Sequence, residues 1–463
     1  MRLSVSAPVL AVSLAVSFAA GSVRAQSIPE TAAALRDKAL AGSLAFDLLE
    51  SLTTEIGPRP VGSPAQRRAM EWGVAKLKAL GFQNVHVEPF AKQAWTRGPE
   101  SAEITGPYPQ KLAILGLGGS IPTPPEGIEA PIALFHTYAD FLAAPDGSLK
   151  GKIAVVTEPM VRTEDVSGYG SIISMRVAGP AEAAKRGAVA YLIRSLSTAD
   201  NRFPHTGNMS PALIPAAALS PSDAGLIDRM ATRGQPITIR LKMDSHVTPN
   251  AQAWNVVGEI PGREAPDQVV LVGGHLDSWD PGTGAIDDGA GVAITTAAAK
   301  LIADLPKAPR RTVRVVMFGS EETGGSGEAY AAAHKAEVGK IVLAGESDLG
   351  SDRVYKLRLA VGGVTNPALT GLADAMAPLK ILLDPTAAVE GGSDIEGLQA
   401  LGAPIVSYYQ DASRYFDTHH SADDVLDRVD RQSLDQNVAA WAAVIYAVAE
   451  SDVDFRKGAP SRP

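Results

Sequence analysis

The pattern of apolar and polar positions divides the chain into several regions, and the first is a short apolar run at residues 7–20. Arg2 precedes this run, and the small-residue sequence VRA follows it at 23–25. The pattern is typical of a secretory signal peptide cleaved before Gln26, because the run is too short to span a bilayer comfortably. We predict that residues 1–25 are this signal and that the protein is periplasmic or secreted. An uncleaved membrane anchor is the alternative.

Helical periodicity dominates the next block. It predicts a helical region over 28–53 and a second helix over 64–80. Ser63 can cap the first amide groups of that second helix, and Pro64 suits its first position. A strand over 84–90 is expected to follow.

Residues 131–242 have a different pattern, with short apolar strands over 152–156 and 188–194 and a helix that starts after Ser220. This small α/β unit carries no cluster of histidine and acidic residues, so we interpret it as an inserted domain. The predicted division of the chain is a signal peptide at 1–25, one discontinuous domain formed by 26–130 and 243–455, the insert at 131–242, and a tail at 456–463.

From residue 255 onward, strand, loop and helix alternate. The apolar strands are expected at 269–273, 313–318, 341–345 and 404–408, and the last helix has one apolar face over 434–448. This alternation is typical of an α/β fold in which a doubly wound, mostly parallel sheet is covered by helices on both faces.

Acidic residues and histidines follow all four of these strands. In an open α/β sheet, sites form outside the carboxyl ends of the strands. Each signal alone is weak, since an Asp near a helix start is often a cap and an isolated Glu-Glu pair is often a solvated face. Their convergence on one edge predicts a functional site. The residues concerned are His275, Asp277, Asp287, Asp288, Glu321, Glu322, Asp348, His419 and His420.

The composition narrows the chemistry of this site. The chain has 463 residues, no cysteine and a net charge of -9, which argues against a nucleic-acid partner. A metal must therefore be held by His, Asp and Glu, and imidazole with carboxylates suits zinc. Two histidines and three carboxylates are too many for one catalytic zinc, but they suit two metals that share a bridging carboxylate.

The motifs GGHLDSWDPGTGAIDDGAG, FGSEETGGSG, GESDLG and THHSADD resemble those of the co-catalytic zinc peptidases of the aminopeptidase and glutamate carboxypeptidase family. The likeness covers nearly the whole mature chain, and the insert resembles a protease-associated domain. The resemblance implies two Zn²⁺ per chain and a cis peptide bond after the bridging aspartate. It also implies roles for individual residues: His275 and Asp348 bind one zinc, Glu322 and His420 bind the other, Asp287 bridges them, Glu321 is the general base, and Asp277 orients the imidazole of His275.

The histidine pair leaves a choice of ligand. His420 is followed by Ser421 and so matches the family's His-Ser pattern better than His419 does. We expect His420 to be the ligand.

Residues that could recognise the substrate form a separate group. An exopeptidase must bind a charged terminus, and the resemblance implies dipeptides with both termini free. Residues that could contact the substrate are Arg414, Tyr408 and Tyr409 before the histidine pair, Asp394 in GGSD, and His205 in PHTG. Each has a structural alternative, such as a salt bridge for Arg414 or a turn for Asp394.

The expected function is therefore hydrolysis of dipeptides or short peptides by a zinc-activated water, with aminopeptidase action on longer peptides as the alternative. Two further readings are a single-zinc glutaminyl cyclase and a binding protein that has lost catalysis. The complete set of ligands and the presence of Glu321 argue against both. The expected partner is a small peptide, with no nucleic acid and no membrane once the signal is removed, and the resemblance implies a homodimer.

Overall fold

A computed structural model describes residue 1 and residues 27–359, 369–384 and 389–456. The predicted signal peptide and the predicted tail lie almost wholly outside these residues, so both stay predictions. Within the described ranges, no helix is long and apolar enough to cross a membrane.

The described chain opens with three helices, α1 (Ile28–Leu40), α2 (Ala45–Glu55) and α3 (Pro64–Ala79). The helical region predicted over 28–53 is therefore two helices, separated at Gly42, whose φ of 129° no right-handed helix accepts. The start of α3 is as predicted, because the Ser63 hydroxyl accepts a hydrogen bond from the backbone N–H of Gln66 at 3.1 Å.

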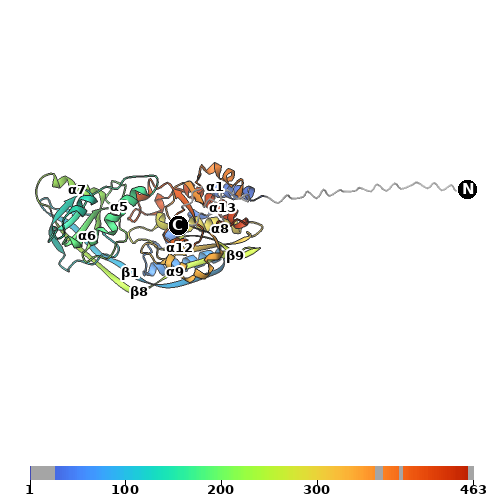
Figure 1. The fold of residues 1–463 in the computed structure, drawn as a ribbon, viewed down its shortest axis with the longest axis horizontal. Coiled ribbons are helices and arrows are strands. Elements are labelled where there is room, and N and C mark those ends of the chain that lie inside the picture. Colours follow the sequence, from blue (N-terminus) through green and yellow to red (C-terminus); the bar gives the residue numbers. More distant parts are fainter. Residues whose placement is uncertain (2–26, 360–368, 385–388, 457–463) are drawn as a thin grey trace.

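Two long antiparallel strands, β1 (Gln83–Gly106) and β8 (Thr238–Ile260), run from one lobe of the molecule to the other (Figure 1). The strand predicted over 84–90 is only the start of β1. We call residues 107–237 the smaller lobe, and residues 27–82 and 261–456 the larger lobe. One end of β8 pairs with a strand of the larger lobe and the other end pairs with a strand of the smaller lobe, so a single sheet passes through both.

The smaller lobe is a parallel sheet with helices. Its elements are β2 (Gln110–Leu112), β3 (Ile114–Gly116), β4 (Ile128–Phe135), α4 (Tyr138–Ala143), β5 (Ile153–Val156), α5 (Ser167–Val177), α6 (Gly179–Lys185), β6 (Ala190–Arg194), β7 (Ala216–Leu219) and α7 (Pro221–Ala231). Strands β4 to β7 are parallel neighbours, and β3 pairs antiparallel with β7. The two predicted strands and the helix after Ser220 are confirmed. The insert boundaries at 131 and 242 stay a prediction.

The larger lobe contains three parallel strands in the order β11–β9–β10, with β8 antiparallel beside β10. These strands are β9 (Ala265–His275), β10 (Arg311–Phe318) and β11 (Ile341–Glu346). Val270 and Val272 of β9 pack on the side of α8 (Ala290–Ala303) and α13 (Arg431–Glu450). Val269 and Leu271 pack on the opposite side, with α9 (Ser326–Ala333) and α12 (Glu396–Ala400). Burial on both faces explains the continuous apolar run of β9 and confirms the doubly wound α/β fold.

The fourth predicted strand borders this sheet. It is β14 (Val406–Gln410), which forms a three-stranded sheet with β12 (Val354–Leu359) and β13 (Leu382–Asp384). A parallel bridge between Ala344 and Ile405 joins it to β11, so its end also lies near the carboxyl edge of the main sheet. The remaining short elements are η1 (Ala285–Gly289), η2 (Lys335–Lys340), α11 (Leu372–Met376), η4 (Ala377–Leu379), η5 (Tyr415–Asp417) and η6 (Leu426–Arg428).

Candidate active site

The parallel register of the larger lobe brings the predicted site residues together. His275, the last residue of β9, pairs with Phe318, the last residue of β10. Glu346, at the end of β11, pairs with Gly273 of β9. The carboxyl ends of parallel strands thus meet at one edge of the sheet. The side chains that converge there are His275, Asp277, Asp287, Glu321, Glu322, Asp348 and His420.

Asp287 lies between two groups of possible metal ligands. Its Oδ1 is 3.0 Å from Nε2 of His275, which in turn is 3.5 Å from Oδ1 of Asp348. Its Oδ2 is 3.1 Å from Nε2 of His420, which is 3.0 Å from Oε2 of Glu322. Each oxygen of one carboxylate therefore faces an imidazole and a further carboxylate, an arrangement that suits two metal ions sharing one ligand.

The donor set also fits zinc. Asp287 is only 4% exposed, and its Oδ2 accepts no hydrogen bond from any residue that the structure describes. Carboxylates outnumber imidazoles around it, and buried negative charge is costly unless it is paired or bound to a metal. Nitrogen and oxygen donors without sulfur are ligands that zinc accepts.

The crowding of carboxylates shifts the proton affinities at the site. Burial lowers the pKa of His275, but the neighbouring carboxylates, Asp348 first, raise it well above the ordinary value. Burial, and then the charge of Asp348, raises the pKa of Glu321 well above its ordinary value. A carboxylate with raised proton affinity is suited to accept a proton from water.

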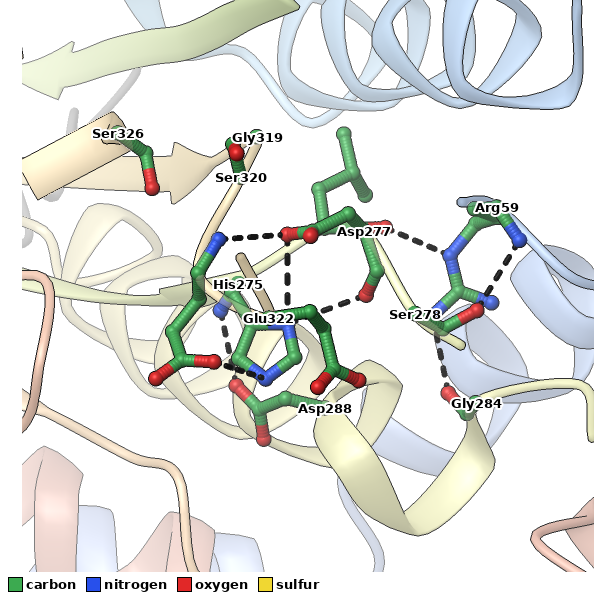
Figure 2. A network of polar contacts seen from close by, with 12 residues as sticks. Arg59, His275, Asp277, Ser278, Gly284, Asp288, Gly319, Ser320, Glu322 and Ser326 are labelled. Atoms are coloured by element: carbon green, nitrogen blue, oxygen red, sulfur yellow. Dashed lines mark hydrogen bonds and ion pairs between the residues drawn. The ribbon is translucent and has the colours of Figure 1, made fainter. Parts of the chain in front are cut away.

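Asp277 is fully buried and holds two of these residues in place. Its Oδ1 accepts a hydrogen bond from the backbone N–H of Glu321 at 3.0 Å and lies 3.5 Å from Nδ1 of His275 (Figure 2). Its backbone carbonyl is 3.1 Å from the same nitrogen. With Nδ1 directed at Asp277, Nε2 of His275 is directed toward Asp287 and Asp348, as expected for an imidazole oriented by a carboxylate.

Arg59 was not singled out in the sequence, yet it connects both ends of the loop that follows β9. Its side chain is completely buried, and its guanidinium donates hydrogen bonds to the backbone carbonyls of Leu276 and Thr283. It also donates one to the backbone carbonyl of Gly284 (Figure 2). Burial lowers its pKa to about 10, so it remains a cation at neutral pH. Arg59 stands alone in a Pro- and Gly-rich loop, and no sequence pattern there indicates contacts with residues so distant in the chain.

The sequence pattern predicts a helix over 288–302, and in the structure this helix, α8, starts two residues later, at Ala290. The peptide bond between Asp287 and Asp288 is cis, as the family resemblance implies, and the backbone of both residues is non-helical. Asp288 acts instead through its side chain, which accepts hydrogen bonds from the backbone N–H groups of His275 at 2.9 Å and Gly291 at 3.0 Å. It ties the end of β9 to the start of α8.

Asp424, also missed in the sequence, supports the bridging position from the other side. Its Oδ1 accepts a hydrogen bond from the backbone N–H of Ile286 at 2.6 Å, and its Oδ2 accepts one from that of Asp287 at 3.3 Å. Burial, and then the charge of Asp287, raises the pKa of Asp424 to about 7. Its place four residues after His420 in THHSADD is the signal that could have identified it.

The two adjacent histidines are both near Asp287. His420 Nε2 approaches Asp287 and Glu322 to within 3.1 Å, whereas His419 Nε2 is 3.6 Å from Asp287 Oδ2. The two rings are stacked, with centroids 3.5 Å apart, and His419 is edge-on to Tyr169. The shorter distances favour His420 as the ligand, which stays a prediction.

The structure does not bring the residues before the histidine pair into this site. Arg414 forms an ion pair with Asp352 and lines a separate cavity. Tyr408 is 4% exposed and stacks on Trp441 in the core, with ring centroids 3.9 Å apart. The hydroxyl of Tyr409 accepts a hydrogen bond from Arg358. Alternation along β14 turns one tyrosine into the core and the other away from the metal ligands.

Asp394 and His205 lie near the site but are buried. Asp394 accepts a hydrogen bond from the Ser326 hydroxyl, and burial raises its pKa to about 7. His205 is 2% exposed, and its two ring nitrogens have no hydrogen-bond partner among the described residues. Burial, and then the charge of His420, lowers the pKa of His205 to about 3. These two effects favour the neutral form of the His205 imidazole.

The ligands open onto a cavity of about 340 Å³ between the two lobes. The larger lobe contributes metal-site residues and the aromatic rings of Tyr415 and Phe416, and the smaller lobe contributes helix α5. The cavity is within the size range of sites for small molecules, about 300–1,000 Å³.

Comparison with known proteins identifies relatives. The model of peptidase family M28 matches residues 255–445. Carboxypeptidase Q of Bos taurus is 38% identical over 410 residues, which is 88% of this chain and 85% of that protein. A solved structure of a peptidase M28 precursor from Shewanella amazonensis SB2B is 42% identical, with a TM-score of 0.91 over 94% of this chain and 99% of that chain. The zinc aminopeptidase BSAP from Bacillus subtilis shares the fold at 19% identity, with a TM-score of 0.64 over 88% of this chain and 95% of that chain.

Proposed function

Because the chain belongs to peptidase family M28 and is a zinc metallopeptidase, we propose that it removes residues from the ends of short peptides with two zinc ions and Glu321 as general base. The observation that carries this proposal is the position of Asp287. Its two oxygens lie 3.0 Å from His275 and 3.1 Å from His420, so one carboxylate can serve two ions.

His275 and Asp348 would hold one zinc, Glu322 and His420 the other, and Asp287 would bridge them. The chemistry that bound zinc supplies is Lewis acidity, which lowers the pKa of a water molecule from about 15.7 towards 7 and polarises a carbonyl group.

Glu321 would move the proton. It would accept a proton from water as the water oxygen forms a bond to the scissile carbonyl carbon. As the C–N bond breaks, Glu321 would return this proton to the leaving amine and regain its charge. The position of Glu321 beside the proposed ligands, with its Oε2 3.9 Å from Nε2 of His275, supports this role. No acyl-enzyme is required.

Asp277 would position both a zinc ligand, His275, and the general base, Glu321. It contacts the imidazole of His275 and the main chain of Glu321, so a shift of Asp277 would move a ligand and the base together. Such supporting carboxylates commonly matter nearly as much as the ligands themselves.

The proposed substrates are dipeptides or short peptides. The similarity to carboxypeptidase Q supports this class, and the small cavity between the lobes agrees with it. Aminopeptidase action on longer peptides is the second candidate, because aminopeptidase YwaD of Bacillus subtilis is also a relative, at 26% identity over 298 residues.

A paired measurement tests the proposal: the zinc content of the purified chain, and the release of free amino acids from a panel of dipeptides and longer peptides. The same assays are run on Glu321→Ala. We expect two zinc ions per chain in both proteins, hydrolysis by the wild type, and a rate about 10²–10⁴-fold lower in the variant. Zinc-loaded wild type that cleaves no peptide would contradict the proposed activity, and one zinc per chain would favour the cyclase reading.

Export, the protease-associated insert and a homodimer remain part of the proposal. N-terminal sequencing of the mature protein tests the first of these, with Gln26 as the expected first residue.

A further inference from the structure

One face of helix α5 in the smaller lobe lines the same cavity as the metal-site residues. Tyr169, Ile173 and Arg176 on this helix border the cavity together with Glu321 and Asp348. The spacing of four and three residues places the three side chains on one side of the helix. The cavity therefore has the carboxylates and imidazoles of the larger lobe on one wall and an arginine on the opposite wall.

Arg176 is buried but is not neutralised. The residue is 6% exposed, and its Nε donates a hydrogen bond to the backbone carbonyl of Asn208 at 3.2 Å. One terminal nitrogen donates a long bond of 3.5 Å to the carbonyl of Thr206, and the guanidinium lies 5.5 Å from the centre of the Tyr169 ring. No carboxylate within the described parts of the chain pairs with it. A guanidinium has five N–H donors, so this cation keeps donors for a ligand.

Other arginines of the smaller lobe differ from Arg176 in this respect. Arg186, also buried, pairs with Glu182, and Arg162 pairs with Asp417. A buried cation without an anion is costly, and a carboxylate ligand would offset that cost.

The sequence PHTG, which was unexplained by the metal site, holds Arg176 in place. Gly207 of this motif has a φ of 138°, and a Cβ atom there would overlap the Arg176 guanidinium. The backbone N–H of Thr206 donates a hydrogen bond to the carbonyl of His420 at 3.0 Å. The motif thus connects the arginine on one wall to a predicted zinc ligand on the other.

We propose that Arg176 binds the free α-carboxylate of the residue that follows the scissile bond. This inference rests on the proposed function and narrows its substrate class to dipeptides. In a dipeptide, one residue, about 3.8 Å of chain, separates the scissile carbonyl from the carboxylate. The cation must therefore lie in the same cavity as the metal ligands, as Arg176 does. The planar guanidinium matches a carboxylate with two parallel hydrogen bonds.

This assignment also separates the two candidate functions. An aminopeptidase acting on longer chains must let the peptide continue past the first residue after the cleaved bond, where a buried arginine would meet an uncharged amide. The substrate of a dipeptidase ends at this residue, and its free carboxylate is negatively charged.

The test compares alanyl-phenylalanine with its C-terminal amide as substrates of the zinc-loaded protein. The variants are Arg176→Gln, Arg176→Lys and the control Arg194→Gln, which removes another largely buried arginine of the smaller lobe that does not line this cavity. We expect the wild type and the control to prefer the acid by about 10–100-fold in kcat/KM. Arg176→Gln should lose this preference, mainly through KM, while its rate on the amide stays unchanged, and Arg176→Lys should recover part of it.

A preference for the acid that survives in Arg176→Gln, or equal losses on acid and amide, would overturn the assignment. So would a wild type that hydrolyses both substrates equally, although the proposed function would then stand. If the zinc-loaded wild type hydrolyses neither of these nor any peptide of the panel described above, the proposed function fails, and calorimetric binding of phenylalanine and phenylalaninamide still tests Arg176. Tighter binding of phenylalanine that disappears in Arg176→Gln supports it, and equal binding of both ligands by the wild type rejects it.

Discussion

In both lobes, parallel strands alternate with helices and polar residues follow the carboxyl ends of the strands. In the smaller lobe, the residues directly after β5, β6 and β7 are Thr157, Ser195 and Ser220. Their hydroxyls bond within that lobe: Thr157 donates to Asp228 at 2.8 Å, and Ser220 accepts from the backbone N–H of Asp223 at 3.1 Å. The hydroxyls that follow these strands, including that of Ser195, which donates to the carbonyl of Leu219, thus have partners within the smaller lobe.

The corresponding edge of the larger lobe carries buried acids in addition to hydroxyls such as that of Ser347. Asp277, Asp287 and Glu346 each keep a buried carboxylate oxygen without a hydrogen-bond partner among the described residues. Unpaired buried polar atoms are rare in native proteins and call for an explanation such as a bound ion. Among the described residues, no carboxylate of the smaller lobe is left in this state, so buried carboxylates without partners distinguish the edge of the larger lobe.

The largest expected effect comes from replacing one acid beside the carboxyl edge of the sheet in each lobe, Asp287 in the larger lobe and Asp228, which accepts a bond from Thr157, in the smaller. Asp287→Asn should lose zinc and at least about 1,000-fold in kcat/KM, because the shared ligand and several kcal/mol of charge stabilisation go with it. Asp228→Asn, in the smaller lobe, should keep zinc and activity. Metal analysis and dipeptide kinetics on both variants check this. If both variants retain zinc equally, the proposed difference between the two lobes is wrong.

Two buried arginines offer the next contrast. Arg59 binds carbonyls around the loop of predicted ligands, whereas Arg186 binds the carbonyls of Ala144 and Leu142 in the smaller lobe. Replacement of either by Lys should lower the free energy of unfolding by about 2–4 kcal/mol, since buried carbonyls lose their donors. Only Arg59→Lys should also weaken zinc binding, by about tenfold. Denaturant titration and zinc competition measure the two effects, and weaker zinc binding in Arg186→Lys would contradict the distinction.

Asp277→Asn tests orientation without removing a predicted ligand. We expect zinc affinity or kcat/KM to fall by about 10–100-fold, because the amide no longer offers a charged acceptor to His275. The matched change in the smaller lobe is Asp223→Asn, where a buried carboxylate accepts a bond from the backbone N–H of Ala113. That variant should lose stability and keep its zinc affinity. If Asp277→Asn also loses only stability and keeps its zinc affinity and kcat/KM, Asp277 does not orient His275.

The smallest expected effect concerns pH. The hydrogen bond to Glu88, at 2.8 Å, raises the pKa of His334 above its ordinary 6.5. Burial raises the pKa of Glu88, but the bond and charge of His334 lower it below its ordinary 4.5. The stability from His334 is thus fully present below pH 6.5 and lost as pH rises through its folded pKa. The contribution of Glu88 is present above pH 4.5 and lost as pH falls.

His334→Gln should therefore lower the free energy of unfolding most between about pH 4.5 and 6.5, by less than about 1 kcal/mol, with no difference at high pH. The control is His136→Gln in the smaller lobe, where the imidazole is 67% exposed beside Asp228 and should contribute nothing measurable. Thermal or urea unfolding across this pH range distinguishes the two. A pH-independent loss in His334→Gln would show that packing, not the ion pair, is responsible.

Much of the fold could be predicted because local patterns determine it. The continuous apolar strand at 269–273 and the capped helix after Ser63 depend on neighbours in sequence, and both are present. The convergence of ligands followed from one rule, that parallel strands end at one edge. The start of α8 was misplaced, because the residues after Asp287 depart from helical geometry to serve the site.

The supporting residues could not be predicted, because their partners are distant in sequence. Arg59 bonds to Gly284, 225 positions away, and Arg414 is drawn from the site by Asp352, 62 positions before it. Arg176 appears in the sequence as one more polar residue on a short helix. Its significance depends on the missing carboxylate partner, which only the packed structure reveals.

The most direct test of the central claim is anomalous diffraction at the zinc absorption edge from crystals of the zinc-loaded protein. The account predicts two peaks, one contacted by His275 and Asp348 and the other by Glu322 and His420, with an oxygen of Asp287 on each. A single peak, or a second peak bound by His419 in place of His420, would contradict the assignment of Asp287 as the shared ligand between these two pairs.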